Sequence, residues 1–327
     1  MMLVNFFLII FCGFILSILL LFSLIRFSLR NRVLVKDAVP FSGGLAIGLA
    51  FLFSSILGMF LLSGSYSQIA GIVISCSIML IFGVIDDLKE LSIFNKFVVE
   101  IIATAFLVLF GVRTNIAYVG NTVNIIITFI WVIGITNAVN HLDVMDGVAA
   151  GISLIASLAF LAISFLVKDT QVQIIALALI GSVSGFLILN YPPAKIYMGN
   201  SGSHFLGFIL AAISMAIGYT GLGREIALLS PLLILGFPIF DTAFLIVVRA
   251  AQGRSALKKS DDHLALRFLR LGFSKRKTLL LMLVLSICFS FAGVFISRVT
   301  NTVGILFLVS LSLLSFIIFR IMGFKHA

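Results

Sequence analysis

Long apolar segments recur along almost the whole chain and limit the folds open to it. Eleven runs of roughly twenty residues cover about residues 3–25, 41–62, 68–85, 97–112, 123–139, 148–167, 171–190, 203–220, 227–248, 278–297 and 301–322. A helix of about 20 apolar residues spans the hydrocarbon core of a bilayer. With 61% hydrophobic and 10% charged residues, the chain is unlike a soluble domain. We therefore expect an all-α integral membrane protein, a polytopic bundle of 10–11 transmembrane helices forming one domain over residues 1–327.

The basic residues predict how these helices are oriented. If the N-terminus lies outside, 18 of the 22 Lys and Arg residues fall on inner loops and the C-terminus, and only four on outer loops. Inner loops of membrane proteins carry such an excess of Lys and Arg. This distribution predicts an outside N-terminus and a cytoplasmic C-terminus. It also explains the net charge of +10, so we expect no nucleic-acid partner.

The densest polar cluster lies at the inner end of the fifth run. Residues 137–147 contain two amides, a histidine and two carboxylates. Helical spacing places Asn137, Asn140 and Asp143 on one stripe, and clusters of amide and carboxylate oxygens suit Mg²⁺ or Mn²⁺. The alternative is a hydrogen-bonded turn with a structural role.

Three more polar segments fall on the same predicted face. Asp86 and Asp87 are adjacent carboxylates that a cation or a proton-transfer role would explain, although they could instead cap a helix end. The Gly/Ser segment 199–203 resembles a backbone nest for a phosphate, or an ordinary turn. Segment 249–277 holds nine basic residues that either set the topology or bind a polyanion. Acids, amides and bases on one face predict an enzyme that acts on phosphates with Mg²⁺.

Six motifs occur in one order between about residues 30 and 290. They are Ser42-Gly-Gly-Leu-Ala, Gly83-Val-Ile-Asp-Asp, Asn137-Ala-Val-Asn-x-x-Asp143-x-x-Asp146-Gly, Lys195-Ile-Tyr-Met-Gly-x-Ser-Gly-Ser, Pro231-Leu-Leu-Ile-Leu-Gly-x-Pro-Ile-Phe-Asp-Thr242 and His263-Leu-x-x-Arg267. Together they resemble the motifs of the polyprenyl-phosphate N-acetylhexosamine-1-phosphate transferases. This family includes the undecaprenyl-phosphate GlcNAc-1-phosphate transferases and, more distantly, the phospho-MurNAc-pentapeptide transferase.

The resemblance implies a reaction and its partners. A UDP-N-acetylhexosamine and polyprenyl phosphate would give polyprenyl-diphospho-sugar and UMP, with Mg²⁺ (or Mn²⁺) as cofactor. This reaction would be the first membrane step of a cell-envelope glycan. It implies a multi-pass protein of the bacterial inner membrane, with a cytoplasmic active site and a plausible homodimer. The sugar, the prenyl chain length and the polymer are not indicated by the sequence.

The resemblance also implies roles for motif residues. Asp86 and Asp87 match the acidic pair that would deprotonate or orient the lipid phosphate, and Asp143 and His263 are further expected catalytic residues. Asn140 and Asn200 match positions on the metal side. The residues expected to bind substrate are Lys96, Asn137, Asp146, Lys195, Gly199, Ser201 and Arg267.

Three positions depart from the family pattern. Asn200 stands where the family has an aspartate that binds Mg²⁺, and Val144 stands where it has glycine. Ala265 and Leu266 replace two histidines of the late motif. An amide oxygen can bind Mg²⁺ without supplying charge, so we expect a lower affinity. Our hypothesis is that two additional histidines, His141 and His204, partly compensate for the missing imidazoles.

These departures keep two other functions open. The first is a catalytically weak paralogue that binds lipid phosphate or serves as an assembly component. The second is a transporter of lipid-linked sugars. A transporter more often has its polar groups near the middle of the bilayer, in broken helices. The gathering of charge on one face therefore favours the enzyme.

Overall fold

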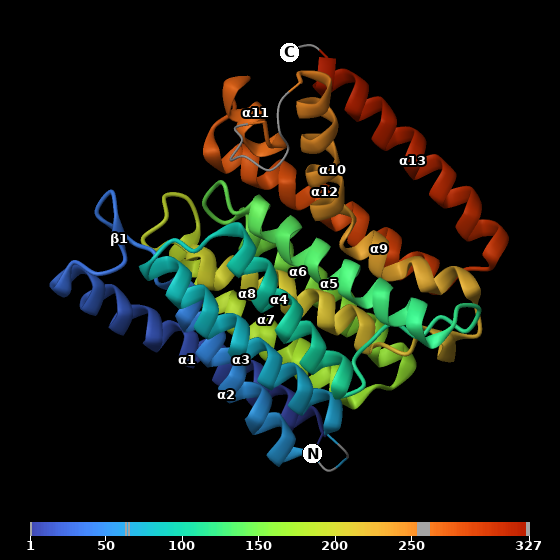
Figure 1. Ribbon diagram of the computed structural model, residues 1–327, viewed down its shortest axis with the longest axis horizontal. Helices are drawn as coiled ribbons and strands as arrows, with labels where there is room; N and C mark the ends of the chain where they lie inside the picture. The colour runs from blue at the N-terminus through green and yellow to red at the C-terminus, as the bar shows by residue number, and fades with distance from the viewer. Residues whose placement is uncertain (1, 63, 65, 254–261, 325–327) are drawn as a thin grey trace.

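The computed structural model describes residues 2–62, 64, 66–253 and 262–324 (Figure 1). These residues form thirteen α-helices, two 3-10 helices and one two-stranded hairpin. The α-helices are α1 (Met2–Asn31), α2 (Gly43–Leu61), α3 (Ser67–Leu88), α4 (Ile93–Leu109), α5 (Asn121–Leu142), α6 (Val148–Val167), α7 (Thr170–Asn190), α8 (Gly199–Ala216), α9 (Ser230–Ile234), α10 (Gly236–Ala251), α11 (Leu264–Arg270), α12 (Lys275–Ile296) and α13 (Asn301–Phe324). The 3-10 helices are η1 (Tyr219–Leu222) and η2 (Glu225–Leu229).

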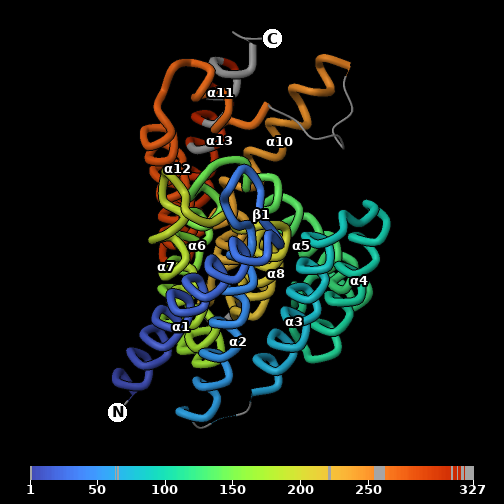
Figure 2. Tube along the Cα trace, turned by 90° about the vertical axis from the view of Figure 1, so that its left-hand side faces the viewer, coloured from blue at the N-terminus to red at the C-terminus, as the bar shows by residue number. Residues whose placement is uncertain are grey.

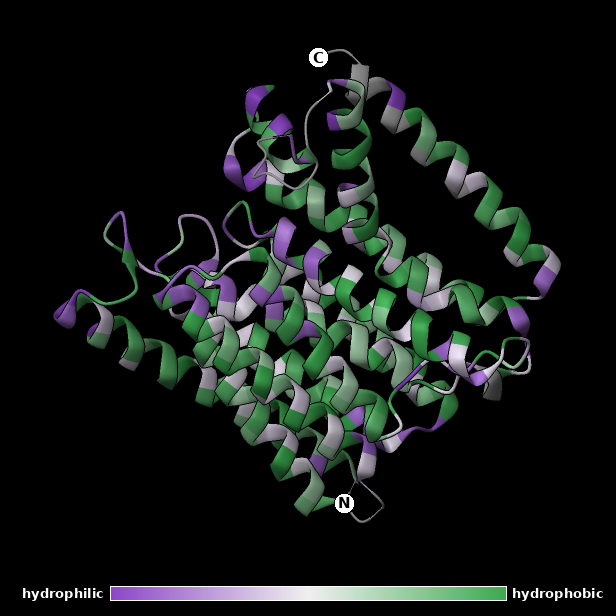
Figure 3. Ribbon diagram, in the orientation of Figure 1, coloured by the Kyte–Doolittle hydropathy of each residue, from purple (hydrophilic) through white to green (hydrophobic). Residues whose placement is uncertain are grey.

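The helices confirm a polytopic membrane fold. Within the described residues, seven helices are long and apolar enough to cross a membrane, or up to eight if the bent pair formed by 225–234 and α10 is one span. Helix α4 has only 17 residues. Figure 3 shows hydrophilic residues gathered at opposite edges of the bundle, with mostly hydrophobic helices between them. The number of 10–11 spans and the orientation of the termini stay predictions.

The ninth expected span is broken. Helix α10 is bent by 66° from the segment 225–234 that precedes it. Pro238 has no N–H to donate to the carbonyl of Ile234, four residues earlier, and a missing helical bond of this kind kinks a helix. The Ser290 hydroxyl donates to that carbonyl instead, at 3.4 Å. The apolar run alone did not indicate this bend.

A short hairpin replaces part of the basic loop after α1. Its strands are β1 (Val35–Lys36) and β2 (Val39–Pro40), and they pair antiparallel. The backbone N–H of Tyr197 donates to the carbonyl of Pro40 at 2.7 Å, which ties the hairpin to the segment before α8. Figure 2 shows the hairpin at the upper end of α1 and α2. Strands were not expected in the all-α bundle. Basic residues 254, 258 and 259 of the later loop lie outside the described residues.

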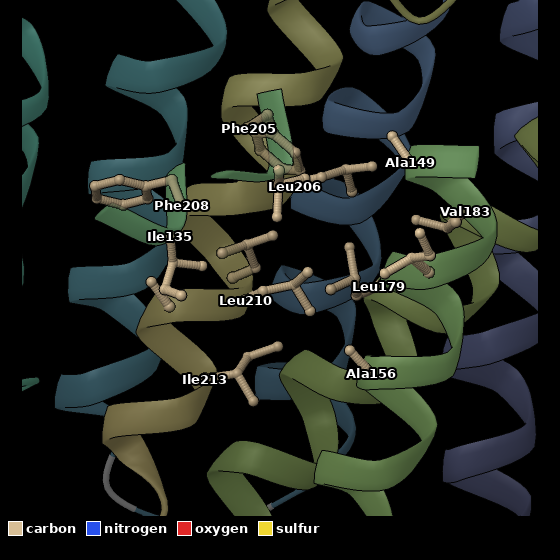
Figure 4. Close-up of a cluster of buried hydrophobic side chains, with 14 of the residues drawn as sticks. Ile135, Ala149, Ala156, Leu179, Val183, Phe205, Leu206, Phe208, Leu210 and Ile213 are labelled. Atoms are coloured by element: carbon tan, nitrogen blue, oxygen red, sulfur yellow. The ribbon is translucent and has the colours of Figure 1, made fainter. Parts of the chain in front are cut away.

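Helix α8 lies at the centre of the bundle. Almost all its residues are buried, and it packs against α2, α3, α5 and α6. Figure 4 shows its side chains Phe205, Leu206 and Leu210 among residues from neighbouring helices. A helix that is buried along almost its whole length and packed by four neighbours has few alternative positions. Its N-terminal end is therefore held in a fixed position, and that end carries one of the polar motifs.

Glycines allow the backbones of three helices to touch at this level. A Cβ at Gly44 of α2 would lie 2.0 Å from the backbone nitrogen of Gly202, and one at Gly83 of α3 would lie 2.4 Å from Cα of Ser201. The N–H of Gly44 donates to the carbonyl of Met198 at 2.8 Å. Small residues permit such close approach between membrane helices. The first turn of α8 is therefore held between α2 and α3.

We expect Gly44→Ala to lower the melting temperature of the purified protein. The added Cβ must push backbone atoms of α8 away, and overpacking of this kind costs about 1–3 kcal/mol. Gly134→Ala in α5 is the control, because nothing lies within 4 Å of its Cβ. That change should stabilise the helix by about 0.5–1 kcal/mol. Thermal unfolding in detergent measures both variants, and equal shifts of the same sign would contradict the close contact.

Candidate active site

An acidic cavity of about 740 Å³ lies at the ends of several helices. A volume between roughly 300 and 1,000 Å³ is typical of small-molecule sites. The residues that line it come from the hairpin, the ends of α3, α5 and α7, the start of α8, and α11 and α12. Five of them are carboxylates, namely Asp86, Asp87, Glu90, Asp143 and Asp146. The cavity therefore joins motifs that are far apart in the sequence.

The structure separates the expected site residues into two groups. Those that line the cavity are Asp86, Asp87, Asp143, Asp146, Gly199 and Asn200. Those that are not among its lining residues are Lys96, Asn137, Asn140, Lys195, Ser201, His263 and Arg267. Several of the second group contact residues of the first, as described below, whereas Lys195 is exposed.

Asp87 binds the start of α8. Its carboxylate accepts the backbone N–H groups of Asn200 at 2.7 Å and Ser201 at 3.0 Å. Anions are stabilised at a helix N-terminus in this way. Gly199, with a φ of +73°, allows the approach, because a Cβ there would lie 2.7 Å from Oδ2 of Asp87. Segment 199–203 was expected to bind a phosphate through its backbone N–H groups. In the structure, two of these N–H groups donate to the carboxylate of Asp87 instead.

Asp86 is neutralised by a lysine. Nζ of Lys96 lies 2.6 Å from Oδ2 of Asp86, and the N–H of Leu91 donates to Oδ1 at 2.8 Å. Asp86 is buried, whereas Lys96 keeps part of its side chain exposed. A buried carboxylate needs such a partner. Lys96 was expected to meet phosphate, and in the structure it first stabilises the charge of Asp86.

Asp143 directly follows α5, and the charges of two other carboxylates act on it. Burial raises its pKa to about 7, and the charges of Asp87 and Asp146 add to the increase. Asp146 accepts the N–H of Ala194 at 3.3 Å and lies 3.7 Å from Nζ of Lys275. Three carboxylates that repel one another in one cavity favour a bound cation or proton.

The late motif is held by Asp241. Nδ1 of His263 lies 2.8 Å from Oδ2 of Asp241, and the N–H of Leu264 donates to Oδ1 at 3.0 Å. This is the partner that an acid inside a membrane helix needs. The ring of His141 lies 6.3 Å from that of His263, and its Nδ1 is buried without a hydrogen-bond partner among the described residues. His141 therefore supplies a second imidazole near the first.

Arg267 has structural partners. Its Nη2 lies 3.6 Å from Oδ1 of Asp262, and its guanidinium lies 5.1 Å from the ring centroid of Phe244. Burial lowers its pKa, and the charge of Asp262 opposes that change. Arg267 was expected to bind substrate, and in the structure it joins α11 to α10.

Two lysines of the cavity were not among the predicted site residues, although Lys275 belongs to the basic segment 249–277. Lys36 from the hairpin and Lys275 from the first turn of α12 both line it. They are the basic residues among the lining residues that the structure describes. No spacing pattern relates Lys36 to the acidic motifs, because the hairpin brings it there. Ser274 caps α12 by accepting the N–H of Lys277, which places Lys275 in the first turn of the helix.

The donor set fits a hard divalent cation better than zinc. Oxygen atoms from Asp87, Asp143, Asp146 and Asn200 line the cavity, and Mg²⁺ prefers such ligands. Within the described residues, no three acidic, histidine or cysteine side chains are grouped closely enough to hold a metal by themselves. Mg²⁺ is commonly bound by one or two carboxylates together with substrate phosphates. The cavity therefore suits a cation that binds with a phosphate ligand.

Membrane-crossing helices with an acidic, phosphate-compatible cavity at their ends define an integral membrane protein with an enzyme-like site. Residues 69–218 match the model of glycosyl transferase family 4. The chain is 32% identical over 287 residues to a probable undecaprenyl-phosphate N-acetylglucosaminyl 1-phosphate transferase of Bacillus subtilis, covering 83% of this chain and 76% of that protein.

Two further relatives agree with this match. A decaprenyl-phosphate N-acetylglucosaminephosphotransferase of Mycobacterium leprae is 33% identical, over 77% of this chain and 72% of that protein. A phospho-N-acetylmuramoyl-pentapeptide-transferase of Staphylococcus carnosus is 27% identical, over 70% of this chain and 76% of that protein. The chain belongs to glycosyl transferase family 4, and the resemblance seen in its motifs is confirmed. It is an enzyme that transfers a sugar phosphate.

We expect Asp143→Asn to raise the melting temperature of the protein in EDTA, and to raise it more at pH 8 than at pH 5. A raised pKa means that ionisation of Asp143 destabilises the folded state. This cost begins above the ordinary pKa of an aspartate and is complete above about pH 7. The amide of the variant carries no charge, so this ionisation cost disappears. A gain of about 1 kcal/mol in the free energy of unfolding would raise the melting temperature by about 2–4 °C. Thermal unfolding at both pH values tests this, and a pH-independent difference would contradict it.

Proposed function

We propose that this enzyme transfers an N-acetylhexosamine 1-phosphate from a UDP-sugar to a polyprenyl phosphate such as undecaprenyl phosphate. The products are polyprenyl-diphospho-sugar and UMP. The acidic cavity at the helix ends carries this proposal, because it gathers Asp86, Asp87, Asp143 and Asn200 from three motifs of the family. The names of two relatives specify undecaprenyl and decaprenyl phosphate acceptors, which supports the lipid.

The reaction exchanges one phosphorus–oxygen bond for another. An oxygen of the lipid phosphate attacks the β-phosphorus of the UDP-sugar, and the bond from that phosphorus to the bridging oxygen breaks as UMP leaves. Asp143 accepts the proton of a singly protonated lipid phosphate, because a base with a pKa of about 7 suits proton transfer near neutral pH. Asp87 holds the start of α8, and each of its oxygens keeps a lone pair directed elsewhere.

The phosphates need positive charge in a cavity lined with acids. Lys36 and Lys275 lie on its wall and would attract them. The amide oxygen of Asn200, which lines the cavity, would hold Mg²⁺ or Mn²⁺ with the cavity carboxylates. Asn140 does not line the cavity but lies in the last turn of α5, just before Asp143, and its amide oxygen would add a further ligand. The bound cation would neutralise charge on the phosphates. We place the site on the cytoplasmic face of the bacterial inner membrane, as the Lys and Arg distribution indicates, and the product would begin a cell-envelope glycan.

A catalytically weak paralogue is the second candidate. Leu266 lines the cavity and Ala265 is buried, so neither position offers an imidazole to a phosphate. Asn200 brings an amide instead of a carboxylate. In that case the protein would bind the lipid phosphate and turn over slowly.

We expect the purified protein to release UMP only when polyprenyl phosphate, the correct UDP-sugar and Mg²⁺ or Mn²⁺ are all present. Asp87→Asn should lower the rate by at least about 100-fold, because the variant loses a charge at the site and an acceptor for α8. Glu225→Gln is the control, because that acid bonds to Tyr118 in an exposed position remote from the cavity. Release of UMP without the lipid would contradict the proposed acceptor.

Asn200→Asp tests the weak-paralogue alternative. Adding a carboxylate to the cavity should lower the Mg²⁺ concentration that gives half-maximal activity, because ligand charge raises affinity for a hard cation. Titration of UMP release with Mg²⁺ measures this in wild type and variant. If wild type is inactive and the variant active, the protein is the weak paralogue. An unchanged Mg²⁺ requirement would exclude residue 200 as a metal ligand.

A further inference from the structure

A connected set of polar side chains is buried behind the cavity, where α4, α5 and α8 meet. Its members are Glu100, Asn137, Asn140, Ser203 and His204. Glu100, Ser203 and His204 are each no more than 2% exposed. Polar groups so placed are costly unless they bond to one another. Their mutual bonds therefore decide which atom of each side chain faces which neighbour.

Ser203 determines which atom of the Asn140 amide faces α8. The Ser203 hydroxyl donates to the carbonyl of Gly199 at 3.1 Å. A hydroxyl has one hydrogen, so its oxygen can only accept from a second partner. Nδ2 of Asn140 lies 2.7 Å from that oxygen and donates to it. The amide of Asn140 thus presents its nitrogen, not its oxygen, to α8.

His204 binds the second N–H of the Asn140 amide. Its Nδ1 lies 3.2 Å from Nδ2 of Asn140 and 3.2 Å from the carbonyl of Asn200, while its Nε2 lies 3.9 Å from Oε1 of Glu100. With the proton on Nε2, an N–H faces the carboxylate and Nδ1 accepts from Asn140. With the proton on Nδ1, that N–H could donate to the carbonyl of Asn200, but it would also face an N–H of Asn140, and a lone pair would face the carboxylate. Because Ser203 fixes Nδ2 of Asn140 as a donor, Nδ1 of His204 accepts from it and the first tautomer is favoured.

Glu100 and the ring of His204 are themselves held in place. Nδ2 of Asn137 lies 3.0 Å and 3.2 Å from the two oxygens of Glu100. The ring of Phe82 meets the ring of His204 edge to face, with centroids 5.9 Å apart. One turn further along α8, a Cβ at Gly207 would lie 2.6 Å from Cα of Thr136, so α5 and α8 touch directly. The imidazole consequently has a fixed position relative to Asn140.

We propose that His204 is a positioning residue that holds the amide of Asn140 with its Oδ1 directed away from α8 as a ligand for the divalent cation. Both N–H groups of Asn140 are used by Ser203 and His204. Its Oδ1 accepts no hydrogen bond from the residues that the structure describes, and the side chain is only partly buried. This inference rests on the proposed function, which assigns Asn140 to the metal.

The role differs from the compensation expected from the sequence. The contacts of His204 are with Asn140, Asn200, Glu100 and Phe82, and those of His141 are with His263. His204 therefore acts through Asn140, in the manner of residues that orient metal ligands. Of the two additional histidines, only His141 lies beside the late motif.

Binding of Mn²⁺ to the purified full-length protein in detergent tests the inference, measured as free Mn²⁺ by electron paramagnetic resonance. His204→Ala should weaken Mn²⁺ binding by about 10–100-fold, the usual effect of losing a residue that orients a ligand. His204→Asn should keep most of the affinity, because its Oδ1 can replace Nδ1 as the acceptor. Ser214→Ala is the control, since it removes another buried hydrogen bond of α8, from Nε1 of Trp131, at a distance from Asn140. Melting temperatures in EDTA show which variants are folded.

Each outcome supports or overturns the inference. Weak binding by His204→Ala together with nearly normal binding by His204→Asn supports it. Equal affinity of wild type and His204→Ala overturns it, and so does equal weakening by Ala and Asn, which would show a packing role. If wild type binds no Mn²⁺, the metal assignment itself fails and the inference fails with it. UMP release measured on the same samples shows whether the proposed transfer survives that result.

Discussion

The whole site depends on carboxylates held at the boundary of a low-dielectric bundle. A charged group there is stable only with a partner, and three acids of the cavity have different ones. Asp86 has Lys96, Asp87 has two backbone N–H groups of α8, and Asp146 has Lys275 nearby. Among the residues that the structure describes, Asp143 forms no ion pair, and burial and the charges of Asp87 and Asp146 raise its pKa. The acid least satisfied by the protein is the one best suited to exchange a proton with a ligand.

The bond between Asp87 and α8 requires unusually close backbones. Asp87 lies at the end of α3 and reaches the first turn of α8 only because Gly83 and Gly44 let three helices touch there. Backbone contacts of this kind are stiffer than side-chain contacts, because they leave no rotamer to adjust. The apolar α8 anchors the arrangement from the centre of the bundle. Fold and site are therefore coupled through a few small residues.

The sequence predicted the helices well, because membrane spans follow from length and hydropathy alone. It also predicted that the segments of Asp86, Asp87, Asp143 and Asn200 lie on one membrane face, and in the structure these residues line one cavity. It could not predict partners. Whether Lys96 binds Asp86 or a phosphate depends on distances of a few ångströms between helices. The hairpin that delivers Lys36 and the bend before α10 depend equally on local three-dimensional geometry.

The altered late motif shows how imidazoles can be redistributed within one site. Positions 265 and 266 lie on α11, a helix of seven residues, whereas His141 and His204 lie on the long α5 and the buried α8. Side chains on longer, covered helices have fewer alternative positions than side chains on a short one, because packing fixes their rotamers. An imidazole beside His263 can serve the same ligand as a lost neighbour, while one beside Asn140 can only change how that amide is held. The two additional histidines are therefore not equivalent, although both occur within the same kind of motif.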